Sequence, residues 1–445
     1  MKKTFLILSF LLFLFNNNSY SNTGNLVIIT SFSKDLTEKF KTEFEKKYPN
    51  IKTEILQKGT PAGVKYIQET KSNNATDLFW VSAPDAMEVL KKDTLLSKYS
   101  PKVKGIPEKI GSFPVHDKDG FYLGFAASGY GIMWNTRYIS ANKIPKPKEW
   151  SDLIKPIYYN HVSMSSPSRS GTTHLTLEAI LQGEGFLKGW QTMKFISGNF
   201  KTVAATSFAV PDGVNSGDVG IGIVIDFFGL SSAASGFPVE FAYPTITALV
   251  PANIALIKNA PNQKNAELFI EFILSSEGQA ILLDPKIRRL PVNPETYSMA
   301  PKDYPNPFKD KSIGKAVNFD VNLSEVRYSV INALFDSMIT YRLNDLKEAV
   351  SAINKAEAAL AKKDNAQAKT LIKEAKELIS KLPITEAQAN DPAFNAIFTK
   401  SRLKEKDNEQ YAGTRQAEIE AQWDKEIVSN YSKAKEKAQL ALKSL

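Results

Sequence analysis

Short β-branched runs alternate with helical patterns between residues 25 and 81, and this alternation constrains the fold more than any other feature. Strands are predicted at Asn25–Ser31, Ile51–Leu56 and Asp77–Val81. Between them, Lys34–Tyr48 carries apolar residues at helical spacing, and a loop over Gly59–Gly63 precedes a helix over Val64–Thr70. This βαβαβ order predicts an α/β fold with a mainly parallel sheet.

Ligands of such sheets bind beyond the carboxyl ends of the strands. The residues that we place at the ends of the first three predicted strands are Thr30, Ser31, Gly59, Thr60, Ser82 and Ala83, which are small, polar and uncharged. Side chains of this kind suit hydrogen bonding to a polar solute better than acid–base chemistry.

The middle of the chain predicts a hinge and a second lobe. Gly124–Asn135 places three glycines inside a strand-like run, which indicates a crossover between two lobes, and Ala248–Ile257 is a candidate for the second crossover. Further strands are predicted at Val162–Met164 and at Asp218–Asp226, the latter ending in a buried acid.

A hydroxyl-rich stretch, Ser165–His174, runs directly into a helical pattern that we expect to continue through Leu187. The free amides and the dipole at such a helix start attract anions, and Ser168, Ser170, Thr172 and Thr173 add hydrogen-bond donors. The guanidinium of Arg169 either donates charged hydrogen bonds to the anion or points to solvent. A plain N-cap in a surface loop is the simpler alternative for the same cluster.

The first residues and the composition bear on location. A basic start, an apolar run over Thr4–Phe15 and small residues at Ser19 and Ser21 predict a secretory signal peptide over residues 1–21. The chain has no cysteine, so disulfides and a lipid-modified cysteine are excluded, and a periplasmic protein is expected, with an uncleaved anchor as the alternative. The net charge of +9 comes without a Lys/Arg block, which favours binding of anions over nucleic acid.

From about residue 320 onward, glycine and proline nearly vanish and helix-forming residues dominate. One apolar stripe is predicted through Val330, Leu334, Met338 and Tyr341, and another along the final segment through Ile419, Trp423, Ile427, Tyr431 and Ala434. The stripes either bury against the lobes and each other or dock to a partner, such as a membrane sensor or another copy of the chain.

Several of these segments resemble the periplasmic solute-binding proteins of ABC importers, of type 2 fold, in the branch of ferric-ion and sugar-phosphate receptors. The resemblance rests on the following segments: Thr30–Phe32, Ser82–Pro84, Ser128–Gly131, Phe269–Gln279 and Leu290–Pro294. Within the branch, Met164–Leu175, Gly189–Trp190 and Ile196–Asn199 are similar to the receptors of phosphoglycerate uptake systems.

The resemblance implies a non-enzymatic receptor with two lobes that close over a ligand. The implied domains are the signal peptide over 1–21, lobe 1 over 22–128 with 249–319, lobe 2 over 129–248, and a helical extension over 320–445. Its expected partners are a phosphorylated small molecule and an ABC permease or membrane sensor, with self-association through the C-terminal helices as a further option. No cofactor is expected.

The ferric-ion relatives bind iron through two adjacent tyrosines at the position of Asp226, Phe227 and Phe228, which supply no phenolate. We therefore expect a phosphate ester as the ligand, with a ferric-ion receptor and a structural protein with a helical stalk as alternatives. The residues expected to bind the ligand are Ser31, Thr60, Ser82, Ser168, Arg169, Ser170, Gly171, Thr172, Thr173 and Asp226. Asp226 would accept hydrogen bonds from ligand hydroxyls.

Overall fold

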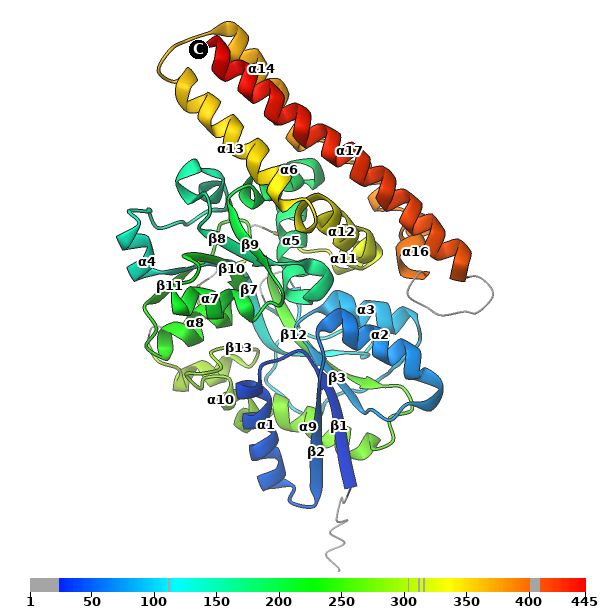
Figure 1. Cartoon of the computed structure of the whole chain (residues 1–445). Helices are drawn as coiled ribbons and strands as arrows, with labels where there is room; N and C mark the ends of the chain where they lie inside the picture. Colours follow the sequence, from blue (N-terminus) through cyan, green and yellow to red (C-terminus); the bar gives the residue numbers. More distant parts are fainter. Residues whose placement is uncertain (1–23, 111–112, 303, 311–312, 315–316, 401–408) are drawn as a thin grey trace, which may run out of the picture.

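The computed structural model describes residues 24–445 except 111–112, 303, 311–312, 315–316 and 401–408. The expected signal peptide over 1–21 lies outside the described residues. Two α/β lobes are stacked one above the other, and a helical extension projects from the upper lobe (Figure 1). None of the helices in the described part of the chain has the length and apolar character needed to cross a bilayer.

Lobe 1 is built on a sheet whose first three strands are parallel, in the order β2-β1-β3-β12-β7. Its strands are β1 (Gly24–Thr30), β2 (Ile51–Gln57), β3 (Leu78–Val81), β4 (Leu96–Ser97), β12 (Leu249–Ile257) and β13 (Leu290–Pro291), with a hairpin of β5 (Lys109–Ile110) and β6 (Phe113–Pro114). Its helices are α1 (Lys34–Lys47), α2 (Thr60–Thr70), η1 (Lys71–Asn73), α3 (Pro84–Lys92), α9 (Gln263–Leu274), α10 (Ser276–Ile281) and η5 (Pro294–Met299). The predicted βαβαβ order is confirmed.

Lobe 2 continues the sheet in the order β7-β10-β8-β9. Its strands are β8 (Val162–Ser165), β9 (Phe200–Ala204), β10 (Ile221–Ile225) and β11 (Val239–Ala242). Its helices are α4 (Thr136–Ala141), η2 (Trp150–Ile154), η3 (Pro156–Tyr158), η4 (Pro167–Arg169), α5 (Gly171–Glu184), α6 (Phe186–Ser197), α7 (Ala209–Ser216) and α8 (Asp226–Ala234). Strands β8, β9 and β10 are parallel, so their carboxyl ends share one edge.

The long strand β7 (Leu123–Asn135) belongs to both lobes. Its first half, as far as Gly129, pairs with β12, and its second half, from Tyr130 onward, pairs with β10. The expected hinge crossover therefore lies at the Gly129–Tyr130 step. The carboxylate of Asp226 accepts a hydrogen bond of 2.7 Å from the Gly129 amide and stabilises this step.

Three expectations about individual elements are wrong. Residues 60–63 are not a loop, because Pro61 lies in the first turn of α2, where a missing amide hydrogen costs nothing. Helix α5 ends at Glu184 rather than Leu187, since Gly185 adopts a φ of +86°. Asp226 opens helix α8 and does not end a strand.

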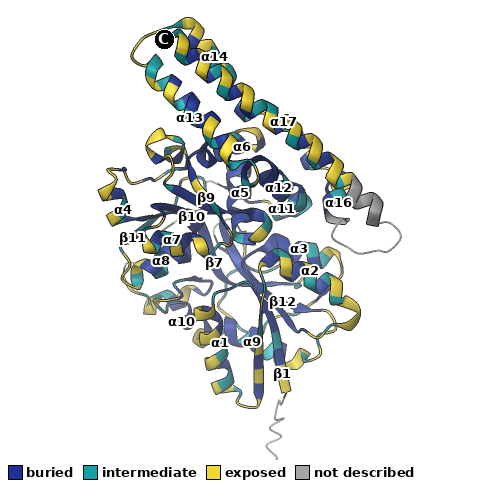
Figure 2. Ribbon diagram, in the orientation of Figure 1, coloured by how far each residue is buried: buried dark blue, intermediate teal, exposed yellow. Residues whose placement is uncertain are grey.

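The extension forms an arm of helices attached to lobe 2. Its elements are α11 (Val321–Val326), α12 (Tyr328–Phe335), the π-helical turn η6 (Asp336–Thr340), α13 (Leu343–Leu360), α14 (Ala366–Ser380), α15 (Glu386–Ala389), α16 (Pro392–Lys400) and α17 (Glu409–Ser444). Helix α17 runs along α13 and α14, and the arm turns buried residues inward and exposed residues outward (Figure 2).

Lobe 2 and the arm share one hydrophobic core, which includes Trp190, Leu334, Val350 and Trp423. The stripes predicted from the sequence are therefore covered by the chain itself. Tyr341 is the exception, because its side chain is 70% exposed at the end of the π-helical turn. Val428 and Leu440 on α17 are further large apolar side chains that stay exposed.

A buried ion pair fastens the arm to lobe 2. Both oxygens of the Glu178 carboxylate on α5 accept hydrogen bonds of 2.8 and 2.7 Å from the guanidinium of Arg327. Burial alone would raise the pKa of Glu178, but the charge and hydrogen bonds of Arg327 hold this pKa below its ordinary value. The pair is therefore ionised when the arm is docked.

We predict that Glu178→Ala lowers the free energy of unfolding by about 3–5 kcal/mol, because it leaves the Arg327 guanidinium buried without its carboxylate. Glu377→Ala is the control, since the Lys373–Glu377 pair at 3.9 Å is exposed and is worth about 1 kcal/mol or less. Urea unfolding of both variants measures the difference. Equal stability of the two variants would contradict this role for the buried pair.

Candidate functional site

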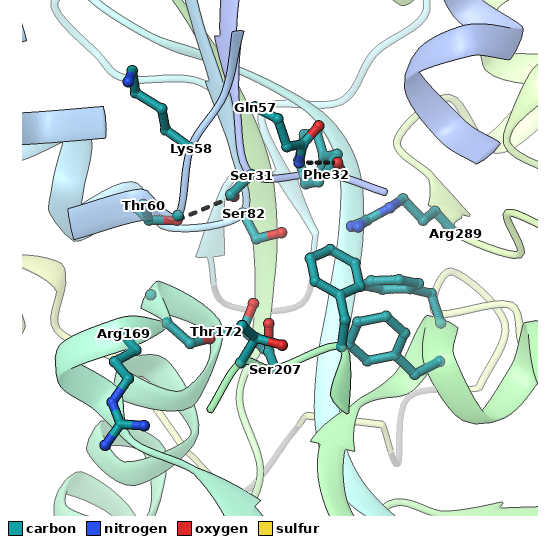
Figure 3. Close-up of a pocket in the computed structure, with 17 residues that line it drawn as sticks. Ser31, Phe32, Gln57, Lys58, Thr60, Ser82, Arg169, Thr172, Ser207 and Arg289 are labelled. Atoms are coloured by element: carbon teal, nitrogen blue, oxygen red, sulfur yellow. Dashed lines mark hydrogen bonds between the residues drawn. The ribbon is translucent and has the colours of Figure 1, made fainter. Parts of the chain in front are cut away.

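The carboxyl ends of strands from both lobes meet around one cavity of about 220 Å³ (Figure 3). Lobe 1 contributes residues that follow β1, β2 and β3, and lobe 2 contributes residues that follow β8, β9 and β10. The lining residues are Ser31, Phe32, Gln57, Lys58, Gly59, Thr60, Ser82, Arg169, Ser170, Gly171, Thr172, Thr206, Ser207, Phe208, Phe227, Phe228 and Arg289.

Helix N-termini point at this cavity from both lobes. Gly59 and Thr60 begin α2, Gly171 and Thr172 begin α5, and Phe228 lies in the first turn of α8. Amides in the first turn have no partner within their own helix, and the helix dipole adds positive partial charge at this end. An oxyanion in the cavity would satisfy several of these donors together.

Seven of the ten residues predicted to bind the ligand line this cavity: Ser31, Thr60, Ser82, Arg169, Ser170, Gly171 and Thr172. The hydroxyl of Thr60 donates to the Ser31 hydroxyl at 3.1 Å, so these two side chains form one polar wall. Arg169 borders the cavity, but its exposed guanidinium extends away from Ser31, Thr60 and Ser82 in Figure 3. The geometry thus favours the solvent-directed alternative for Arg169.

The other three predicted residues do not line the cavity. Ser168 contacts the Ser166 hydroxyl at 2.7 Å, and the Thr173 amide donates to the Ser170 hydroxyl at 3.2 Å, the hydrogen bond of an N-cap.

The Asp226 carboxylate is fully buried and accepts hydrogen bonds from the Gly129 amide, the Phe227 amide and the Tyr243 hydroxyl. Burial raises the pKa of Asp226 to about 6. Asp226 thus stabilises the hinge and lies outside the cavity lining, and its expected contact with a ligand stays a prediction.

Arg289 is the main cavity residue that the sequence analysis did not identify. Its side chain is 1% exposed, and its guanidinium carbon lies 3.7 Å from the centre of the Phe227 ring and 4.4 Å from that of Phe32. Burial lowers the pKa of Arg289 to about 9, while the charge of Asp226 opposes this shift. Arg289 is therefore a cation at neutral pH.

Thr206, Ser207 and Phe208 follow β9, while Gln57 ends β2 and Lys58 follows it. The rule that ligands bind beyond the carboxyl ends of strands did not reach Thr206, Ser207 and Phe208, because no strand was predicted at β9, and at β2 it pointed to Thr60 instead of Gln57 and Lys58. Arg289 has a weaker signal, because the only hint is a basic residue directly before the apolar run that forms β13.

The two lobes are in direct contact beside the cavity. A Cβ atom on Gly171 would lie 2.9 Å from the Cβ of Ala83 and 3.1 Å from the Cβ of Thr60, both in lobe 1. Only glycine lets the start of α5 approach lobe 1 this closely. The lobes are thus closed around the cavity.

A second hollow, of about 470 Å³, lies between α2, α3 and the extension. Its lining is mostly apolar, and its rim charges Lys92 and Glu325 pair with each other. Helix starts border this hollow too, at Pro61, Tyr328 and Pro392, but among the described residues that line it there is no buried cation without a partner. We therefore place the functional site in the smaller cavity.

We predict that Gly171→Ala weakens the binding of inorganic phosphate about tenfold, because overpacking of about 1–3 kcal/mol opposes lobe closure. Gly213→Ala on α7 is the matched control, since its added Cβ would meet Val219 at an ordinary 3.4 Å. Isothermal titration measures both affinities. Unchanged affinity in the Gly171 variant would show that contact of the lobes here does not support binding.

The chain matches the family of bacterial extracellular solute-binding proteins over residues 73–315. The phosphoglycerate transport regulatory protein PgtC of Salmonella typhimurium is 29% identical over 384 residues, which make up 85% of this chain and 91% of PgtC. Two solved structures share the fold. The periplasmic binding protein AfuA of Actinobacillus pleuropneumoniae, with exogenous fructose 6-phosphate bound, has a TM-score of 0.62 and 22% identity, covering 70% of this chain and 98% of AfuA.

The periplasmic binding protein P5PA has a TM-score of 0.64 and 21% identity, covering 71% of this chain and 99% of P5PA. At these identities both structures are evidence for the fold alone. This fold is the expected two-lobed type 2 fold with hinge crossovers. The family match covers more than half of the chain. The chain therefore belongs to the bacterial extracellular solute-binding proteins.

Proposed function

We propose that this protein is an exported, periplasmic receptor that captures a phosphorylated small metabolite in the cavity between its lobes. The observation that carries the proposal is the meeting of several helix N-termini with the buried cation Arg289 around one small cavity. Free amides and small hydroxyls are groups that proteins use to bind phosphate, and a buried guanidinium binds the anionic groups of a ligand. The net charge of the chain, +9, is positive, as is the charge of Arg289, and a positive charge favours an anionic ligand.

The similar proteins support the same ligand class. One of them is named for phosphoglycerate transport, and another holds fructose 6-phosphate. The candidate ligands are therefore a phosphoglycerate and a hexose phosphate. Both are small phosphorylated metabolites, consistent with a cavity of about 220 Å³.

The ferric-ion alternative has less support. Phe227 and Phe228 line the cavity where the resemblance would place the two iron-binding tyrosines, and phenyl rings supply no ligand atom. Among the described residues, no group of three or more histidine, aspartate or glutamate side chains is placed to hold a metal ion. Membership in the solute-binding family likewise favours a receptor over a structural stalk.

The proposed role is binding and delivery, with the ligand left chemically unaltered. An ABC permease or a membrane sensor would receive the closed receptor, and the outer face of the arm, with Tyr341, Val428 and Leu440 exposed, offers one surface for such a partner or for self-association. A signal peptide over residues 1–21 would direct export.

We predict that the purified protein binds at least one ester among 3-phosphoglycerate, glucose 6-phosphate and fructose 6-phosphate with a dissociation constant in the micromolar range or below. The matched controls are glycerate, glucose and fructose, which lack the phosphoryl group and should bind at least 100-fold more weakly, because they leave the helix amides unpaired. Isothermal titration measures the affinities, and recovery of intact ester tests for catalysis. Tight binding of ferric citrate with no binding of any ester would reverse the assignment.

A further inference from the structure

Arg289 leaves hydrogen-bond donors unused inside the closed cavity. Its Nε atom and one terminal nitrogen are fully buried and have no hydrogen-bond partner within the described part of the chain. A buried donor on a charged group costs free energy unless an acceptor meets it. The site therefore calls for an acceptor that the protein itself does not provide.

The nearest acid does not fill this need. Asp226 lies close enough to interact with the charge of Arg289, but its oxygens already accept hydrogen bonds from Gly129, Phe227 and Tyr243. The Phe32 and Phe227 rings lie against the guanidinium and offer no conventional acceptor.

Arg289 also lies apart from the start of α5. It precedes β13 in lobe 1, whereas Gly171 and Thr172 belong to lobe 2. In Figure 3 its side chain enters the cavity from the side away from Arg169 and Thr60. The cavity thus has two separate places that favour negative charge: the amides and hydroxyls at the start of α5, and the guanidinium of Arg289.

We infer that the ligand carries two anionic groups, a phosphoryl group at the start of α5 and a carboxylate at Arg289. This inference rests on the proposed function and narrows its ligand class to phosphorylated hydroxy acids. A planar carboxylate can accept two parallel hydrogen bonds from a guanidinium, and aromatic rings against the guanidinium face leave such in-plane bonds free. A hexose phosphate has no second anion for Arg289.

The test compares 3-phosphoglycerate with glycerol 3-phosphate, which lacks only the carboxylate, in the wild type and in Arg289→Gln. The wild type should prefer 3-phosphoglycerate at least tenfold. Arg289→Gln should bind 3-phosphoglycerate roughly 10- to 100-fold more weakly, while its affinity for glycerol 3-phosphate changes less than threefold. Arg288→Gln is the matched control, because this neighbouring arginine does not line the cavity and should keep the wild-type preference.

If Arg289→Gln lost affinity equally for both esters, the phosphoryl group would lie at Arg289 and the inference would be overturned. Unchanged affinity for both esters would overturn it as well. Thermal unfolding without ligand checks the fold. Arg289→Lys serves as a second variant, which keeps the positive charge but loses the planar guanidinium that can donate two parallel hydrogen bonds. A wild type that binds hexose phosphates as tightly as 3-phosphoglycerate contradicts this inference alone. A wild type that binds no phosphate ester contradicts the proposed function as well.

A different set of contacts carries a second inference, about lobe closure. Helix α11 of the extension touches both lobes at once. The Ser324 hydroxyl donates to the Asp85 carboxylate of lobe 1 at 2.9 Å and lies 3.2 Å from Nε2 of His174 in lobe 2. Nε2 of His174 is also 3.2 Å from the Asp85 carboxylate, and all three side chains are buried.

The remaining contacts show which lobe the extension follows. His174 contacts Asn332 through Nδ1 at 2.7 Å, and the Ser166 hydroxyl donates to Asp336 at 2.6 Å, so α12 and η6 are fastened to lobe 2. Ser324 and the Lys92–Glu325 ion pair instead join α11 to α3 of lobe 1. Opening of the lobes would separate α11 from α3.

We propose that α11 acts as an interlobe latch, formed by Ser324 and Glu325 on α11 with Asp85 and Lys92 on α3. The latch stabilises the closed state without touching the ligand, because these four residues lie outside the cavity lining. Any interaction that stabilises only the closed state raises apparent affinity. The extension thereby regulates the same site that binds the ligand.

The chain has no native cysteine, so paired spin labels can report the distance between the lobes. Labels at Lys71→Cys in lobe 1 and Lys188→Cys in lobe 2 occupy exposed positions. In the ligand-free protein, Ser324→Ala and separately Lys92→Met should shift the distance distribution toward the open form. Ser380→Ala, which removes a hydroxyl bonded within α14, is the matched control and should leave the distribution unchanged.

The substitution Lys92→Met alters an exposed side chain, so its fold should survive even if Ser324→Ala destabilises the core, and thermal unfolding checks both. A distance distribution that is identical in the wild type and both latch variants would overturn the latch. This readout needs no ligand, so it is independent of the proposed function.

Discussion

The site depends on one electrostatic constraint: the carboxyl ends of parallel strands in two lobes face each other, and the helices that follow begin there. Each helix start brings unpaired amides and positive partial charge to the same small volume. Arg289 adds a full charge that is buried without enough acceptors. Lobes that close over this volume need an anion between them, and the closed form is accordingly favoured when an anion is bound.

Closure in turn depends on a few residues at the junctions of the chain. Gly171 lets α5 meet lobe 1, while Asp226 holds the amide of Gly129 at the point where β7 changes partners. Burial raises the pKa of the Asp226 carboxyl group. This group also interacts with the charge of Arg289 and offsets part of that positive charge. The hinge and the anion site are therefore electrostatically coupled, although Asp226 does not line the cavity.

Much of this arrangement could be predicted from local sequence, because strand and helix patterns and the rule for strand ends depend on neighbouring residues. Those patterns predict that Ser31, Thr60, Ser82 and the start of α5 lie at the ligand site, and all of them line the cavity. Arg289 could not be placed, since its position depends on packing between Phe32 and Phe227, which lie far away in sequence. The contacts of Asp226 could not be predicted either, because its donors Gly129 and Tyr243 come near it only in the fold.

A crystal structure of the protein with its tightest-binding ester is the most direct test of the central claim, that the closed cavity binds a phosphate ester through the helix amides and Arg289. The account predicts phosphoryl oxygens within hydrogen-bonding distance of the Gly171 and Thr172 amides, and a ligand oxygen on the Arg289 guanidinium. A ligand bound elsewhere, for example in the apolar hollow between α2, α3 and the extension, would contradict it.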